Sequence, residues 1–148
     1  MTKDVLVSVC GIQSQDGEKD KTEAITVGSY YKRNGSHYLL YEEMMEGFSE
    51  PVKNMVKFSE GQLNVQKRGL ITSIMTFEEK KKNLSNYVTP YGNIMVGIDA
   101  KNIHIEEDDE QIKVQVEYAM EVNYKHLADC TLTIDIKAKR EGITFSLS

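Results

Sequence analysis

Arg68 is one of three arginines in this 148-residue chain, together with Arg33 and Arg140. A guanidinium group can hold a carboxylate or phosphate through two parallel hydrogen bonds, so an arginine inside a cavity would bind an anion. In the run that ends at Arg68, strict alternation places Leu63 and Val65 on one face and Arg68 on the other. Arg68 would line a cavity if the apolar face turned outward. Otherwise it faces solvent or ties strands together through a glutamate.

The segment from Tyr87 to Gly92 offers a second set of candidate residues. Tyr87 and Tyr91 each present a large ring and a hydroxyl group. Pro90 cannot donate a backbone hydrogen bond, so strand pairing ends there or the segment lies at an edge. Gly92 allows a positive φ. The segment is therefore either a corner pinned by two tyrosines or the mouth of a ligand pocket.

Glu42 is the acidic candidate, because strand geometry puts it on the same face as Glu46. Two such carboxylates could act as acid and base across a cavity, or they could lie on a solvated edge. We expect ligand binding at Arg68, Tyr87, Tyr91 and Glu42. The sequence contains no Gly-x-Ser-x-Gly motif and no phosphate-binding glycine loop, so no catalytic residue is assigned.

The histidines and cysteines do not predict a metal site. His37, His104 and His126 are scattered, without the HxH or HExxH spacing of metal ligands. Cys10 and Cys130 lie near opposite ends of the chain and form no CxxC pair. We expect two reduced, mostly buried thiols rather than a disulfide. No metal and no cofactor are predicted.

The charge balance argues against nucleic acid as a partner. The formal net charge is -5 and the pI is about 5.3, whereas phosphate binding needs clustered lysines and arginines. The one tight basic run, residues 80–82, is interpreted as a solvated turn. No apolar run approaches the ~20 residues that span a bilayer. The first residues do not resemble an export signal, so we expect a cytoplasmic protein that does not bind membranes.

Alternating apolar and polar residues recur along the whole chain and predict strands. The clearest case is 112–122, where large apolar residues occupy the even positions. A polar, mobile connection is expected at 14–21, and 125–129 could form one helical turn. Asn34-Gly35 predicts a tight hairpin turn. The expected strands are 5–13, 23–33, 37–46, 52–59, 62–68, 70–77, 84–89, 93–106, 111–124 and 132–140, with a last piece at 143–147.

Consecutive hairpins without helical crossovers predict an all-β fold in a single domain, residues 1–148. The two architectures that fit are an antiparallel up-and-down barrel of about eight to ten strands and a two-sheet sandwich. Long strands joined by short turns favour the barrel, since closure removes exposed sheet edges. A barrel of this size is filled by side chains or holds a small ligand.

Five short motifs give the chain a family resemblance. They occur in this order: Glu46-Gly47, Val56-Lys57-Phe58, Val65-Gln66-Lys67-Arg68-Gly69, Met75-Thr76-Phe77 and Tyr87-Val88-Thr89-Pro90-Tyr91-Gly92. The pattern resembles a family of small bacterial proteins, mostly from Firmicutes, typified by YwiB and classed as a domain of unknown function. The resemblance implies a calycin-like barrel, related in shape to lipocalins and fatty-acid-binding proteins, and implies no activity. The lipocalin Gly-x-Trp and the Arg-x-Tyr pair of fatty-acid-binding proteins are missing.

Three functions follow from this sequence, in order of preference. The first is binding of a small amphipathic or anionic molecule inside the barrel. The second is a filled barrel that serves as a structural or protein-interaction module, for example a homodimer. The third is an enzyme of unknown reaction, which would need a carboxylate or tyrosine with a shifted pKa inside a cavity.

Overall fold

The computed structural model describes residues 4–44 and 46–139 of the chain. All of the regular elements within these residues are strands. None of the described residues forms a helix long and apolar enough to cross a membrane. The prediction of an all-β fold is confirmed. The strands are β1 (Asp4–Gln15), β2 (Glu18–Arg33), β3 (Ser36–Glu43), β4 (Val52–Ser59), β5 (Gln62–Arg68), β6 (Ser73–Glu78), β7 (Lys81–Thr89), β8 (Gly92–Glu107), β9 (Gln111–Val122) and β10 (Lys125–Ala138).

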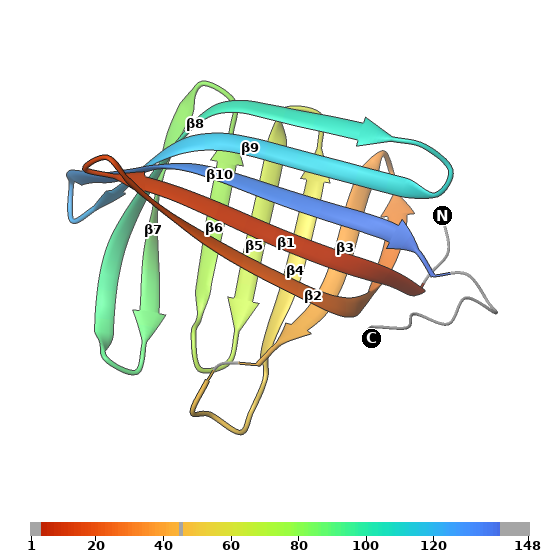
Figure 1. Cartoon of the computed structure of the whole chain (residues 1–148), viewed down its shortest axis with the longest axis horizontal. Coiled ribbons are helices and arrows are strands. Elements are labelled where there is room, and N and C mark those ends of the chain that lie inside the picture. Colours follow the sequence, from red (N-terminus) through yellow and green to blue (C-terminus); the bar gives the residue numbers. More distant parts are fainter. Residues whose placement is uncertain (1–3, 45, 140–148) are drawn as a thin grey trace.

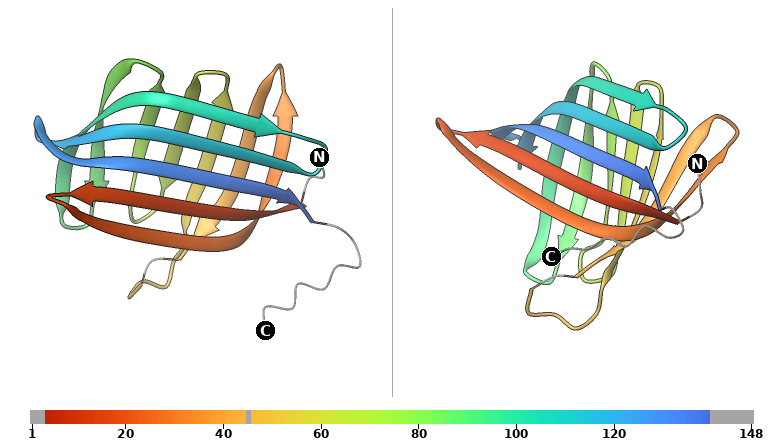
Figure 2. Two further views of the ribbon diagram at one scale, coloured as in Figure 1. Left: turned by 45° about the horizontal axis from the view of Figure 1, so that its top comes forward. Right: turned by 45° about the vertical axis from the view of Figure 1, so that its right-hand side comes forward.

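The ten strands form one antiparallel sheet that curls into a nearly closed barrel (Figures 1 and 2). The strand order is β6-β5-β4-β3-β2-β1-β10-β9-β8-β7, so neighbours in sequence are neighbours in space and β1 pairs with β10. A seam between β6 and β7 completes the circle. There, Thr72 and Val88 exchange two backbone hydrogen bonds of 3.0 Å. The predicted up-and-down antiparallel barrel is confirmed.

Alternation along each strand fills one part of the lumen with aliphatic and aromatic side chains. Cross-strand pairs such as Val7–Ile136 and Leu39–Val56 show which positions share the inner face. These positions are the apolar ones, because burying them removes apolar surface from water. The largest fully buried inner side chains are Phe58, Phe77, Leu39, Leu63, Ile98, Ile112, Ile134, Ile136, Val5, Val7 and Val56.

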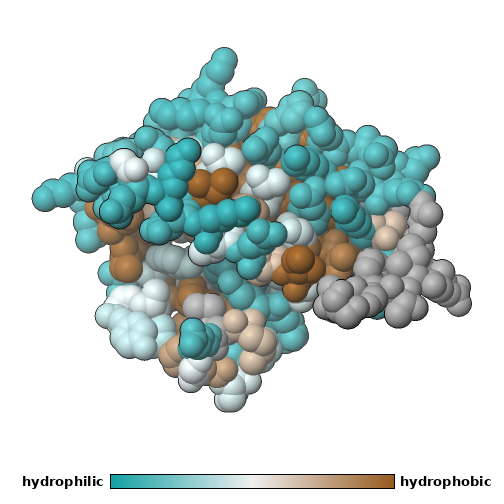
Figure 3. Space-filling model, viewed as in Figure 1, coloured by the Kyte–Doolittle hydropathy of each residue, from teal (hydrophilic) through white to brown (hydrophobic). Residues whose placement is uncertain are grey.

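The other part of the lumen is open, because β2 pairs with β3 along only part of its length. Among the described residues, positions 18–27 of β2 pair with β1 alone, and pairing with β3 begins at Gly28. A Cβ atom at Gly28 would lie 2.6 Å from the carbonyl oxygen of Leu40, so glycine permits this close approach. Figure 3 shows the surface hollowed beneath the front strands. Inner side chains that pack on the core but stay partly exposed include Val9, Met75, Tyr87, Ile94, Tyr118, Met120 and Leu132.

Two local expectations are wrong. The expected loop at 14–21 is a tight hairpin, because Asp16 and Gly17 both take a positive φ and β2 already begins at Glu18. The possible helical turn at 125–129 belongs to β10, where β9 supplies the backbone partners. The expected piece at 143–147 and the predicted strand end at Arg140 lie outside the described residues.

Candidate ligand site in the barrel lumen

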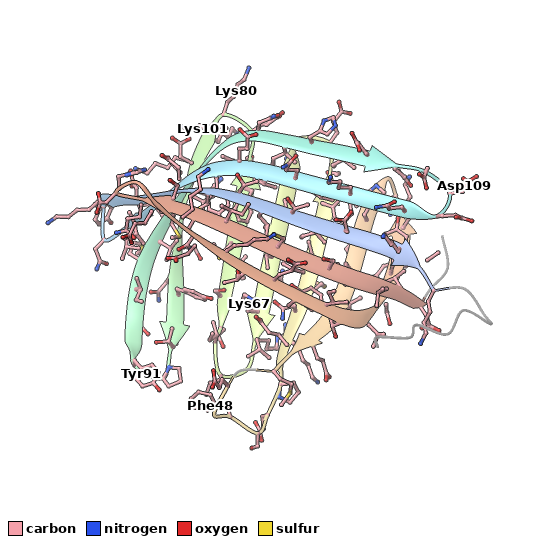
Figure 4. The ribbon with its side chains drawn as sticks, viewed as in Figure 1. Phe48, Lys67, Lys80, Tyr91, Lys101 and Asp109 are labelled. Atoms are coloured by element: carbon pink, nitrogen blue, oxygen red, sulfur yellow. The ribbon has the colours of Figure 1, made fainter. Side chains whose placement is uncertain are left out.

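Three polar side chains from three consecutive strands meet inside the barrel. Lys67 Nζ on β5 donates to Glu43 Oε1 on β3 and to Asn54 Oδ1 on β4, each at 2.9 Å. Asn54 lies directly opposite Lys67 in the β4–β5 ladder. Both side chains are on the same inner face as Val56 and Val65. In Figure 4, Lys67 is seen among the lower ends of the strands behind β2. We call Glu43, Asn54 and Lys67 the polar cluster.

The three side chains of the polar cluster differ in how exposed they are. Asn54 is 2% exposed, and the side chains of Lys67 and Glu43 are 18% and 38% exposed. The Asn54 amide also donates to the carbonyl oxygen of Val52 at 3.3 Å and to Glu43 Oε1 at 3.4 Å. The pairing of Lys67 offsets the cost of removing its charge from water. The amide is therefore fixed, whereas the carboxylate borders solvent.

Ser73 on β6 extends the polar cluster. It pairs with Lys67 across the β5–β6 ladder, where directly opposite Cβ atoms are about 5 Å apart. Ser73 is 4% exposed, and its Oγ atom has no hydrogen-bond partner among the described residues. Buried hydroxyl groups are normally hydrogen-bonded, so this one is available to a further group beside Lys67.

Two tyrosines border the same space. Burial raises the pKa of Tyr41 and of Tyr87, and the Glu43 carboxylate raises the pKa of both further. Both side chains also pack against the apolar core. The two hydroxyl groups therefore stay protonated at neutral pH and remain hydrogen-bond donors. We call the polar cluster together with Tyr41, Ser73 and Tyr87 the lumen site.

A cavity of about 730 Å³ adjoins the lumen site where β2 leaves β3. Tyr41 and Asn54 belong to both. Its lining combines inner side chains such as Val5 and Thr26 with outward-facing residues such as Glu42 and Lys53. A volume of this order suits a small organic ligand. The cavity thus opens beside the lumen site and shares Tyr41 of β3 and Asn54 of β4 with it, while Lys67, Ser73 and Tyr87 lie next to it on β5 to β7.

Arg68 lies on the outer wall of the barrel. The apolar face of β5 turns toward the lumen, so Arg68 is exposed and lies opposite Lys53 of β4. Glu42 is also exposed and pairs with Lys53 from the β3 side. Glu42 is one of the residues that line the cavity, whereas Arg68 is not.

The two predicted tyrosines, Tyr87 and Tyr91, lie in different environments. Tyr87 faces the lumen and is largely buried near Glu43. Tyr91 is 89% exposed at the turn between β7 and β8 (Figure 4), where its backbone N–H donates to Thr89 Oγ1 at 3.1 Å. The structure therefore brings Tyr87 to the lumen site and leaves Tyr91 outside it. The ligand-binding role of each residue stays a prediction.

Sequence reasoning did not select Lys67, Glu43, Asn54 or Ser73. A signal for three of them was present in the alternation. Lys67 continues the apolar phase of Leu63 and Val65, and Asn54 interrupts the apolar phase of β4. Glu43 follows Leu39 and Tyr41 in the same way. Polar residues at the core-facing positions of three consecutive strands predict a polar site in the interior.

A second buried polar group lies near the opposite ends of β2 and β3. Tyr30 Oη is 2.6 Å from His37 Nδ1, and Glu107 Oε1 lies 3.6 Å from His37 Nε2. The His37 ring stacks on Phe58 with a centroid distance of 4.5 Å. Burial lowers the pKa of His37 and, with Glu107, raises the pKa of Tyr30 to about 12. A neutral imidazole that accepts from the Tyr30 hydroxyl fits this arrangement.

The remaining candidate ligands of metals do not gather. No group of three or more His, Cys, Asp or Glu side chains in the described part of the chain could hold a metal ion. Both thiols are free. Cys10 lies opposite Thr133 and Cys130 opposite Gln13 on the same pair of strands, so the two point to opposite faces of the wall.

Comparison with known proteins places the chain in a family. Residues 7–134 match the model of a domain of unknown function, DUF1934. The chain is 27% identical over 133 residues to the uncharacterized beta-barrel protein YwiB of Bacillus subtilis (strain 168), covering 88% of this chain and 92% of that protein. The crystal structure of the Bacillus subtilis ywiB protein has the same fold, with a TM-score of 0.83, 24% identity and 93% of each chain covered. The barrel with its internal polar cluster therefore belongs to the DUF1934 family.

Proposed function

We propose that the protein binds a small amphipathic molecule in the open part of its lumen. The polar end would lie at the lumen site, and the apolar end would contact the partly exposed inner side chains. The observation that carries this proposal is the inward-facing hydrogen-bonding cluster of Lys67, Glu43 and Asn54 beside a cavity of about 730 Å³. The cavity lining contains both polar and apolar residues, which suits a ligand with a polar and an apolar end.

Two further features support this interpretation. Met75 and Met120 are flexible side chains on the inner wall, and methionine adapts to ligands of different shape. The calycin-like resemblance, which stays a prediction, favours an internal ligand. We further propose that the protein acts in the cytoplasm, and its two free thiols are consistent with this location.

A displacement assay with two tyrosine variants tests the proposal. The probe is 1-anilinonaphthalene-8-sulfonate, displaced by soluble amphiphiles with anionic, neutral or cationic head groups. Tyr87→Ala removes a lumen wall, and Tyr91→Ala removes an exposed ring of the same kind. We expect Tyr87→Ala to weaken binding by about tenfold, or 1.4 kcal/mol, and Tyr91→Ala to leave it unchanged. Absence of binding by every amphiphile, or equal effects of both variants, would contradict the proposal.

A second candidate function, self-association, is favoured by the edge of β2. Residues 18–27 pair on one side only among the described residues, and Ile25 and Val27 are each 58% exposed. In an antiparallel pairing of two copies centred on Thr22, Lys21 of one copy would face Glu23 of the other, so the charges would be complementary in that register. Sedimentation should then show a dimer that Ile25→Lys dissociates. A strict monomer at high concentration would exclude this candidate.

A further inference from the structure

The lumen site has an excess of hydrogen-bond donors. The Lys67 ammonium has three N–H groups, and two of them go to Glu43 Oε1 and Asn54 Oδ1. The Ser73 hydroxyl has no partner among the described residues and lies across the ladder from Lys67. Tyr41 and Tyr87 add two protonated hydroxyl groups near Glu43. A group that only accepts hydrogen bonds matches this set best.

The cation of this site is held more firmly than its anion. Asn54 anchors Lys67 from a position that is 2% exposed, and the amide is itself bonded to the Val52 carbonyl. Glu43 is the most exposed member of the cluster and stands at the end of β3. Its carboxylate can therefore turn into water without being left buried and unpaired, whereas Lys67 cannot.

We propose that the lumen site takes the carboxylate head of a single-chain amphiphile on Lys67 Nζ and Ser73 Oγ, and that Glu43 occupies this position in the free protein. The inference rests on the proposed function and names its ligand class. Glu43 then acts as an internal competitor. It neutralises Lys67 while the lumen holds no ligand, and it moves toward solvent when the ligand carboxylate arrives.

Head groups other than carboxylate fit less well. A cationic amine would meet Lys67 and could pair with Glu43 alone. A neutral alcohol could accept from Ser73 but would leave the Lys67–Glu43 pair in place, and so would gain no charge-assisted bond. A carboxylate only accepts hydrogen bonds, and its two oxygens can accept from the Lys67 ammonium and from the Ser73 hydroxyl at the same time.

Calorimetry with three ligands of equal chain length tests this inference: decanoate, decanol and decylamine. We expect decanoate to bind at least about tenfold more tightly than decanol, since a charge-assisted hydrogen bond is stronger than a neutral one. Lys67→Met should remove that preference. Glu43→Gln should tighten decanoate by about three- to tenfold and leave decanol unchanged, because the competing charge is gone. Lys113→Met, an exposed lysine on the outer face of β9 and away from the cavity, is the matched control and should change neither.

The outcomes separate the two proposals. Equal binding of decanol and decanoate, or weaker decanoate binding by Glu43→Gln, overturns the carboxylate assignment and leaves lumen binding standing. Failure of all three ligands to bind overturns both. Glu43→Gln is expected to gain affinity, so a loss of folding cannot imitate the predicted result. Thermal melting of each variant verifies that the barrel is intact.

Discussion

Lys67 and Arg68 are adjacent in the sequence and lie on opposite sides of the barrel wall. Lys67 joins the polar cluster, whereas Arg68 is exposed opposite Lys53. Since exposed charges contribute about 0–1 kcal/mol, Arg68→Ala should change the free energy of unfolding by less than about 1 kcal/mol. Urea unfolding at neutral pH measures this. A loss above about 2 kcal/mol would place Arg68 in a buried network and contradict the strand orientation.

His37 should make stability depend on pH. Burial lowers its folded pKa below the ordinary value of 6.5, and the nearby Lys32 lowers it further, against the opposing effect of Glu107. The unfolded chain therefore takes up this proton first as the pH falls. The stabilisation from neutral His37 is complete above pH 6.5 and decreases below that value, until the folded protein is protonated too.

Urea midpoints at about pH 7.5 and pH 5.5 measure this dependence. The urea midpoint of the unmodified protein should be lower at the lower pH than at the higher pH. This decrease should be smaller in His37→Gln. His104→Gln is the matched control, because His104 is exposed on β8. Identical pH dependence in His37→Gln and the unmodified protein would show that His37 is not the responsible group.

At the scale of strands, adjacent leucines on β3 test the alternation. Leu39 is fully buried among inner side chains, and Leu40 is 39% exposed on the outer face. Leu39→Ala should destabilise the protein by about 2–5 kcal/mol, because it removes buried methyl groups and leaves a cavity. Leu40→Ala should cost less than about 1 kcal/mol. Similar losses for the two variants, measured by urea unfolding, would mean that β3 does not have one buried face.

Alternation predicted most strands because burial of one face controls both the residue pattern and the strand geometry. It failed at the start of β2, where the charged residues 18–21 resemble a loop. Those side chains are exposed, and within the described part of the chain only β1 pairs with this edge, so these positions do not need alternating apolar residues. The turn at Asp16 and Gly17 brings them into register.

At the scale of the whole molecule, the sequence predicted the barrel but not which part of it would be open. The opening depends on where β2 leaves β3, which is decided by long-range pairing and by the close approach at Gly28. Tyr87 was predicted on its residue type and lies at the lumen site. Arg68 was selected for its charge, although the alternation already placed it on the face opposite Leu63 and Val65.

The barrel also separates two internal environments. The packed part carries the stability, with Phe58, Phe77 and many aliphatic side chains removed from water. The open part carries the polar cluster and the partly exposed side chains of the inner wall. The ligand that we propose would therefore occupy the open part without rearrangement of the packed core.

Methyl NMR of protein labelled with ¹³C-methionine tests ligand binding in the lumen most directly. Met75 and Met120 face inward, opposite Val65 and Ile98, whereas Met55 and Met95 occupy outward positions of their strands. On titration with decanoate, the methyl signals of Met75 and Met120 should shift in a saturable way while those of Met55 and Met95 stay in place. Shifts confined to Met55 and Met95, or no saturable shift at all, would contradict binding inside the barrel.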